Sequence, residues 1–185
     1  DFMKSYHINN SEWVDNFAAY PSNHLALIDK KTGALELYDG RLRSIDFEGN
    51  ELLNIEDIEY RDHFKEGVEP WSYLKFPYMT KYGREKGWNR VGPLARLNTC
   101  THINTPLAEI ERQIFKAYTK NKPNNMTMHT HWARLIELLH CAESIKELLL
   151  DEDIMGTDLV RKGVPRRKGI GVIEAPRGTL IHEYH

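Results

Sequence analysis

The sequence predicts an α+β fold, in which a β-meander and hairpins pack with a helical layer that includes two long antiparallel helices. Three observations predict this fold. Apolar runs separated by turn residues fill the first third of the chain, apolar residues recur at helical spacing between 105 and 150, and two more apolar runs flank a Pro-Arg-Gly turn near the end. With 185 residues, the chain is long enough for one hydrophobic core, so we expect a single domain over 1–185.

Composition and charge exclude several classes of protein. The 25 Lys and Arg against 27 Asp and Glu leave a formal charge of -2, which implies no nucleic acid partner. No apolar run approaches the roughly 18 residues of a membrane span. The chain starts at Asp1, and we expect a cytoplasmic, internal fragment of a longer protein. Cys100 and Cys141 are the only cysteines, and we expect buried thiols in a reducing compartment rather than a disulfide.

Residues 24–54 have the pattern of a β-meander. Apolar runs over 24–28, 34–38 and 42–47 are separated by a Lys31-Thr32-Gly33 turn and by the pair Asp39-Gly40. Asp-Gly between two such runs is a strong hairpin signal, because both turn positions need a positive φ. A short helix over 11–17 precedes the meander, and another is expected over 55–67. From Trp71 to Gly92 the many aromatic residues follow no period, which predicts an irregular segment packed on a core.

A helical hairpin is predicted over 105–150. Thr105-Pro106 has the form of an N-cap followed by proline, and apolar residues then recur at helical spacing to Asn121. A longer helix should run over 127–150, with an apolar stripe wide enough to predict burial on more than one side. The short link over 121–125 makes the two helices antiparallel neighbours.

The last segment, 169–185, has the pattern of a hairpin around a type I turn, Ala175-Pro176-Arg177-Gly178. An arginine held between proline and glycine could aim five permanent donors at a fixed acceptor. The simpler interpretation is a solvated arginine at a hairpin tip. The apolar flanking strands favour a buried hairpin instead, and an arginine carried inward must be paired. Glu174 is a candidate for fixing either Arg177 or the turn.

Four segments of the chain carry a family signature: GIGVIEAPRGTLIH at 169–182, EPWSYLKFPY at 69–78, VGPLARLN at 91–98 and ARLIELLHCAE at 133–143. Together they resemble the large subunits of nickel–iron hydrogenases, closest to the cytoplasmic bidirectional branch. The resemblance implies a nickel-dependent oxidoreductase whose catalytic large subunit carries out the reversible heterolytic oxidation of dihydrogen at a NiFe(CN)2CO centre. It also implies two kinds of partner: an iron-sulfur small subunit and a cofactor-reducing, diaphorase-type module.

The resemblance assigns roles to four residues. Arg177 matches the arginine above the open position between the two metals, and we expect it to act electrostatically, because a guanidinium is a poor base. Ala175, Pro176 and Leu180 match residues that line the pocket of the metal centre. The two cysteine pairs by which the family binds its metals are absent, so the resemblance assigns no metal ligand to this chain. We therefore expect the fragment to bind no cofactor and to be inactive alone.

Two other interpretations stay open. The chain could be a metal-free structural or quinone-facing relative of the complex I type, or an unrelated binding module that recognises a partner through its aromatic stretch 71–88. The histidines are numerous enough to suggest an independent metal site, but their spacing forms no chelate on a helix or strand, which favours structural roles. They are His129, His131, His140, His182 and His185.

Overall fold

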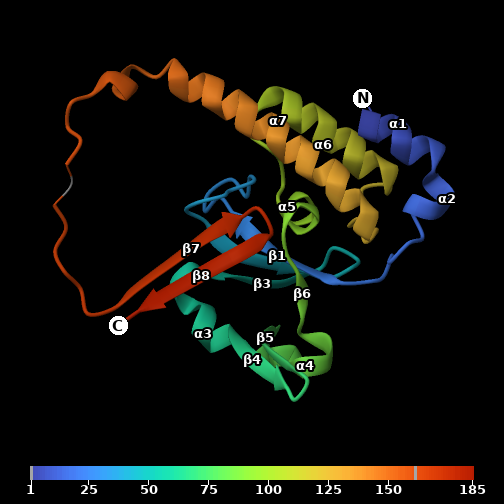
Figure 1. Ribbon diagram of the computed structural model, residues 1–185, viewed down its shortest axis with the longest axis horizontal. Helices are drawn as coiled ribbons and strands as arrows, with labels where there is room; N and C mark the ends of the chain where they lie inside the picture. Colours follow the sequence, from blue (N-terminus) through green and yellow to red (C-terminus); the bar gives the residue numbers. More distant parts are fainter. Residues whose placement is uncertain (1, 161) are drawn as a thin grey trace.

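The computed structural model describes residues 2–160 and 162–185. It has the expected α+β composition: a helical layer, a central buried helix, a mixed sheet and two separate hairpins (Figure 1). The helices are α1 (Phe2–Asn9), α2 (Ser11–Val14), α3 (Tyr60–His63), α4 (Gly83–Lys86), α5 (Pro93–Thr99), α6 (Pro106–Tyr118) and α7 (Thr130–Leu149). The strands are β1 (Asn23–Ile28), β2 (Arg41–Ile45), β3 (Glu51–Glu56), β4 (Phe64–Glu69), β5 (Ser72–Met79), β6 (Asn89–Arg90), β7 (Gly169–Ala175) and β8 (Gly178–Tyr184).

The main sheet has the order β3-β2-β1-β6, with β1 antiparallel to β2 and parallel to β6. The predicted meander is confirmed except for its strand over 34–38, which is wrong: only Leu35 forms a bridge, to Ile28. The carboxylate of Glu36 accepts hydrogen bonds from the amides of Leu37 and Tyr38, both at 2.9 Å. A side chain that binds its own following amides bends the backbone away from a ladder. The antiparallel partner of β1 is therefore β2.

The helical hairpin is confirmed, and Figure 1 shows α6 and α7 side by side in opposite directions. At one end Glu143 of α7 accepts from the amide of Ala108 at 2.9 Å, and at the other the rings of Phe115 and Trp132 lie 5.2 Å apart. The prediction that α7 is buried on more than one side is wrong for its second half. Its buried residues lie between Trp132 and Glu137, and Leu149 is 65% exposed.

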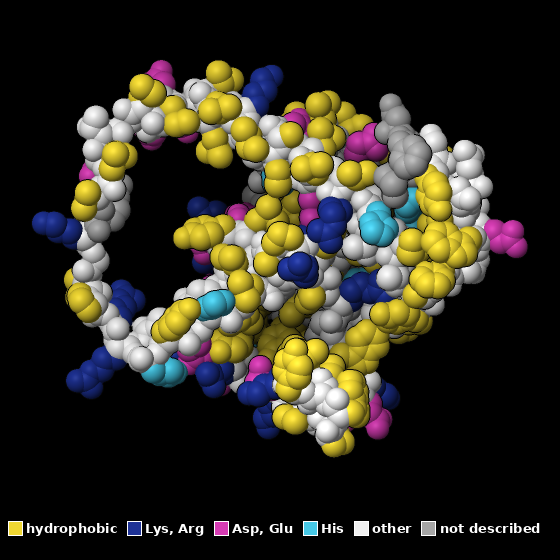
Figure 2. Space-filling model, viewed as in Figure 1, with side chains coloured by type: hydrophobic (Ala, Val, Ile, Leu, Met, Phe, Trp, Pro, Cys, Tyr) yellow, Lys and Arg dark blue, Asp and Glu magenta, His cyan; other side chains and the backbone are white. Residues whose placement is uncertain are grey.

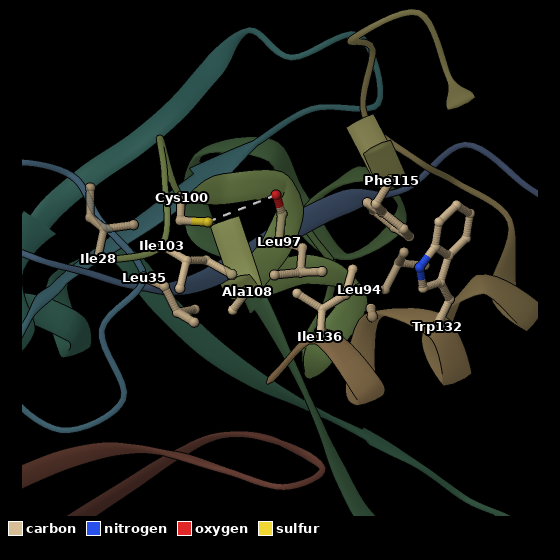
Figure 3. Packing of buried hydrophobic residues seen from close by; sticks show 11 residues of the cluster. Ile28, Leu35, Leu94, Leu97, Cys100, Ile103, Ala108, Phe115, Trp132 and Ile136 are labelled. Atoms are coloured by element: carbon tan, nitrogen blue, oxygen red, sulfur yellow. Dashed lines mark hydrogen bonds between the residues drawn. The ribbon is translucent and has the colours of Figure 1, made fainter. Parts of the chain in front are cut away.

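The core is centred on α5, whose seven residues are all buried. Apolar side chains of α5 meet those of α6 and α7, and Figure 3 shows Leu94 and Leu97 directed toward Trp132 and Ile136. Cys100 follows α5 in this core, with its thiol 3.9 Å from the carbonyl oxygen of Leu97. Both cysteines are free thiols. The short helix α5 thus joins the helical layer to the sheet.

Residues 55–92 differ from the prediction. Only the single turn of α3 is α-helical within 55–67, and an antiparallel β4–β5 hairpin replaces the irregular segment. Trp71 and Tyr73 are 76% and 95% exposed, so the prediction that the aromatic stretch packs on the core is wrong for these two. They lie at the turn and on β5, and Figure 2 shows apolar side chains gathered over this hairpin. Neither Trp71 nor Tyr73 belongs to a core cluster of the described chain.

Across the described ranges, no helix has the length and apolar character needed to cross a membrane.

Candidate functional site

The C-terminal hairpin is confirmed, with a two-residue turn. Ala175 pairs with Gly178, which leaves Pro176 and Arg177 as the turn residues. Among the described residues, the non-glycine residues with a positive φ are Ala18, Lys120 and Asn121, so Pro176 and Arg177 both have a negative φ. Type II and the mirror-image turns need a positive φ at one of these positions and are excluded, whereas the predicted type I turn needs a negative φ at both.

The turn packs against the residues that precede α5. A methyl group built on Gly178 would lie 2.3 Å from Cγ2 of Val91, and one built on Gly92 would lie 2.8 Å from the carbonyl oxygen of Arg177. Gly92 also has a φ of +87°, which side chains rarely adopt. Glycine at both positions lets the two backbones touch. The VGPLARLN and EAPRG segments, distant in sequence, meet at this contact.

The structure places the four predicted site residues at the surface of this turn. Arg177, Pro176 and Leu180 are exposed, and Ala175 is half-buried. The expectation that Arg177 is carried inward is wrong for this chain. The backbone of the turn is packed while the side chain of Arg177 is exposed, because the carboxylates buried nearby bind a different arginine. The four residues remain grouped around one turn at the surface of the chain.

The buried arginine of the hairpin region is Arg96 of α5. Its side chain is 2% exposed, and its Nε and Nη2 donate to the two carboxylate oxygens of Glu137 at 2.5 and 2.7 Å. Its Nη1 donates to Oε2 of Glu174 at 2.8 Å and to the carbonyl oxygen of Ala175 at 2.9 Å. One guanidinium therefore joins α5, α7 and β7. Paired ions of this geometry offset the large cost of burying each charge.

Glu174 fixes the turn rather than Arg177. Its side chain is fully buried, and its Oε1 accepts from the amide of Leu27 at 2.9 Å and from Oγ1 of Thr179 at 2.8 Å. Burial raises the pKa of Glu174 above its ordinary value, against the opposing effect of Arg96. Burial also acts to lower the pKa of Arg96, but the two carboxylates outweigh it and raise that pKa. Three donors converge on Glu174, so the site is built for its carboxylate form.

Sequence reasoning missed Arg96 and Glu137. Each is a charged residue inside an otherwise apolar stretch, Arg96 between Ala95 and Leu97 and Glu137 between Ile136 and Leu138. A charge on an apolar helix face must be paired if that face is buried. This signal was present in both segments. What the sequence could not show is that the two residues are partners, because they lie 41 positions apart.

The described residues offer no donor set for a metal ion or an iron-sulfur cluster. No group of three or more His, Cys, Asp or Glu side chains able to hold a metal occurs among them. Burial raises the pKa of the Cys100 thiol, which disfavours the thiolate that a metal requires. His129 is fully buried, with Asn124 at 2.8 Å from Nδ1 and Asp15 at 3.0 Å from Nε2, as expected of a structural histidine.

A separate groove of about 890 Å³ lies between β8 and the β4–β5 hairpin. Its lining includes the aromatic residues Phe64, Phe76 and Trp88, together with Thr179 and Ile181 of β8. None of the four predicted site residues lines this groove. Thr179 also belongs to the hydrogen bonds of Glu174, so the groove borders the back of the same hairpin.

Comparisons with known proteins give one consistent result, although no family model matches. The chain is 46% identical over 182 residues to the beta subunit of the NAD-reducing hydrogenase HoxS of Cupriavidus necator, covering 97% of this chain and 37% of that protein. It is 40% identical over 185 residues to a vhu-type F420-non-reducing hydrogenase subunit of Methanococcus voltae, covering 100% and 43%. It is 38% identical to an F420-non-reducing hydrogenase iron-sulfur subunit of Archaeoglobus profundus, covering 88% and 35%.

A solved structure agrees with these relatives. The crystal structure of an NAD+-reducing nickel–iron hydrogenase in the H2-reduced state superposes with a TM-score of 0.92 at 40% identity. The match covers 98% of this chain and 40% of the hydrogenase chain. The chain thus spans less than half the length of each of these relatives.

The descriptions of the relatives contradict the sequence-based identification as a catalytic large subunit. None of them names a large subunit, and the Archaeoglobus profundus relative is described as an iron-sulfur subunit. The identification as a catalytic large subunit is therefore wrong. The four sequence segments indicate the class of enzyme. They do not identify the subunit, because the cysteine pairs that would distinguish the subunits are not among these 185 residues.

The coarser conclusion holds along nearly the whole chain. Identity of 46% and a TM-score of 0.92 exceed what a shared fold alone would give. The chain is homologous to a segment of one of the subunits of nickel–iron hydrogenases.

Proposed function

We propose that this chain acts as part of a nickel–iron hydrogenase complex, an oxidoreductase, in which it presents Arg177 on a rigid turn to the redox site of the complex. The observation that carries the proposal is the contrast at the turn. Its backbone is fixed by α5, by α7 and by the Val91–Gly92 contact, while the side chain of Arg177 is exposed. A guanidinium that is always charged, carried on a rigid backbone turn, can donate hydrogen bonds to an acceptor that another chain or a cofactor supplies.

The role of Arg177 in this proposal is electrostatic. A guanidinium keeps its proton, so it can orient and stabilise a negatively charged or electron-rich group without taking part in proton transfer. Ala175, Pro176 and Leu180 would form the apolar surface beside it. A dry, apolar surrounding strengthens such an interaction, because charges interact more strongly where water is excluded. The proposal assigns no metal ligand to the chain.

The partners proposed are the other chains of such a complex. One relative is named as the beta subunit of an NAD-reducing hydrogenase, which supports a complex that includes a cofactor-reducing module. The apolar residues exposed on α7, on β8 and on the β4–β5 hairpin are consistent with covering by further protein.

The test uses the intact complex, purified through a tag on the full-length protein that contains this chain. Hydrogen-dependent reduction of a viologen dye is measured for the wild type, Arg177→Lys and Arg177→Ala, together with nickel and iron content. We expect both variants to assemble with unchanged metal content and to lose roughly 100-fold or more of the turnover. Arg166→Ala, in the exposed loop over 162–168, is the matched control and should keep full activity.

Two results would reject the proposal. Full turnover in Arg177→Ala would show that the turn does not face the redox site. A wild-type complex without nickel and without hydrogen-dependent dye reduction would favour the metal-free structural relative instead.

A further inference from the structure

The two carbonyl groups that precede Arg177 are each held by an arginine from a different helix. Arg96 of α5 donates to the carbonyl oxygen of Ala175 at 2.9 Å, and Arg134 of α7 donates to that of Pro176 at 3.1 Å. We propose that Arg96 and Glu137, with Arg134, are positioning residues that set the placement of the Arg177 turn. This inference rests on the proposed function and deepens it.

The guanidinium of Arg96 is itself held in one position and orientation by its hydrogen-bond partners. Its four hydrogen bonds go to Glu137, Glu174 and Ala175, and its side chain is 2% exposed. The bidentate contact with Glu137 fixes the plane of the guanidinium, because two parallel N–H donors must meet two oxygens. Since rotation would leave a buried charge unpaired, the plane has one favourable orientation.

The same connection continues into the sheet. The amide of Glu174 donates to the carbonyl oxygen of Leu37 at 2.8 Å, and its carboxylate accepts from the amide of Leu27 in β1. A continuous path of hydrogen bonds therefore runs from β1 through Glu174 and Arg96 to Glu137 on α7. These hydrogen bonds fix the position of the turn relative to β1, α5 and α7 together. Apolar packing alone is not directional and would fix that position less tightly.

Two different arginines therefore have two different roles: Arg177 is exposed on the turn, and Arg96 holds the turn in place. Arg96 is buried and its guanidinium is bound by Glu137, Glu174 and the carbonyl of Ala175, whereas Arg177 is exposed two residues beyond that carbonyl. A lysine in place of Arg96 would keep the charge but could not form the bidentate contact and the carbonyl contact together. The size of the effect follows from geometry, because a misplacement of about 1 Å can cost roughly 100-fold in rate.

The experiment compares two Glu→Gln changes on the same helix in the intact complex. Glu137→Gln weakens the hold on Arg96, and Glu143→Gln, six residues along α7, removes a carboxylate that caps α6 and touches no residue of the turn. The readouts are turnover, the KM for hydrogen, the pH profile, and the infrared stretching bands of the diatomic ligands of the metal centre. For Glu137→Gln we expect a roughly 10- to 100-fold fall in turnover, a nearly unchanged KM and shifted infrared bands. Glu143→Gln should change none of the four.

Arg134→Met is the second variant, because Glu137→Gln could reduce assembly of the complex. Arg134 is exposed, so its loss leaves no buried charge, and we expect the same changes with a smaller amplitude. If both variants keep wild-type bands, pH profile and turnover while Arg177→Ala loses activity, the positioning inference fails and the proposed function stands. If the wild-type complex itself shows no such bands, the proposed function fails.

Discussion

Gly178 lies so close to Val91 that even one added methyl group cannot fit between them. A methyl built on Gly178 would lie 2.3 Å from Cγ2 of Val91 and 2.7 Å from its Cβ. Gly178 also has a φ of +153°, in a region that favours glycine. The contact joins the closing residue of the Pro176–Arg177 turn to the start of α5. The position of the hairpin thus depends on the absence of a side chain at one residue.

Gly178→Ala should therefore destabilise the chain and move the turn. Overpacking of a close contact costs about 1–3 kcal/mol, and the unfavourable φ adds to this cost. Gly171→Ala is the matched control on β7, since no atom lies within 4 Å of its added methyl group. Urea unfolding of both variants measures the difference. Equal unfolding free energies for the two would contradict the importance of the contact.

Phe115→Ala should remove a large part of the stability of the helical layer. Phe115 is fully buried in the core cluster and lies edge-on to Trp132. Truncating a buried phenylalanine typically costs about 3–5 kcal/mol, because it leaves a cavity as well as losing apolar burial. Leu148→Ala on α7 is the control, as Leu148 is 62% exposed. We expect its unfolding midpoint in urea to stay close to that of the wild type, and a loss as large as that of Phe115→Ala would argue against this core.

Stability should fall as the pH drops from about 6.5 toward 4. Burial lowers the pKa of His7 and that of His24 to about 4, from an ordinary value of 6.5. In this window the unfolded chain takes up protons that the folded chain does not, so acid favours unfolding, and the effect is absent above it. The measurement is the unfolding free energy at pH 7.5, 6, 5 and 4.

His7→Leu should flatten this pH dependence. Nδ1 of His7 is a buried nitrogen for which the described residues provide no hydrogen-bond partner, so an apolar replacement removes an unsatisfied polar atom. Gln113→Leu, a non-titrating exposed residue on α6, is the matched control and should keep the wild-type slope. An unchanged slope in His7→Leu would place the pH dependence on other groups.

Replacing exposed aromatic residues on the β4–β5 hairpin should change association more than folding. Trp71 and Tyr73 are 76% and 95% exposed, so we expect Trp71→Ser with Tyr73→Ser to shift the unfolding free energy by less than about 0.5 kcal/mol. The same change should weaken self-association of the isolated chain or binding of a hydrophobic dye, because exposed apolar patches bind one another. Light scattering and dye fluorescence test this. A cooperative loss of folding would show that the aromatic residues pack on the core after all.

Much of the architecture could be predicted from local patterns. The helices α6 and α7 and the β7–β8 hairpin follow from apolar periodicity, from Thr105-Pro106 and from the Pro-Arg-Gly turn. The patterns failed where a single side chain changed the outcome. Glu36 binds the amides that follow it and ends the expected strand over 34–38, and no local rule predicts which acidic residue will do so.

The sequence by itself determined the class of fold, the turn that carries Arg177 and the resemblance to nickel–iron hydrogenases, because these depend on residues adjacent in the chain. Only the tertiary structure decided which arginine is buried. Arg177 is exposed and Arg96 is buried, because the two carboxylates that can offset the burial of a guanidinium, Glu137 and Glu174, meet beside α5. Those partners lie 41 and 78 residues from Arg96, a separation that no local pattern records.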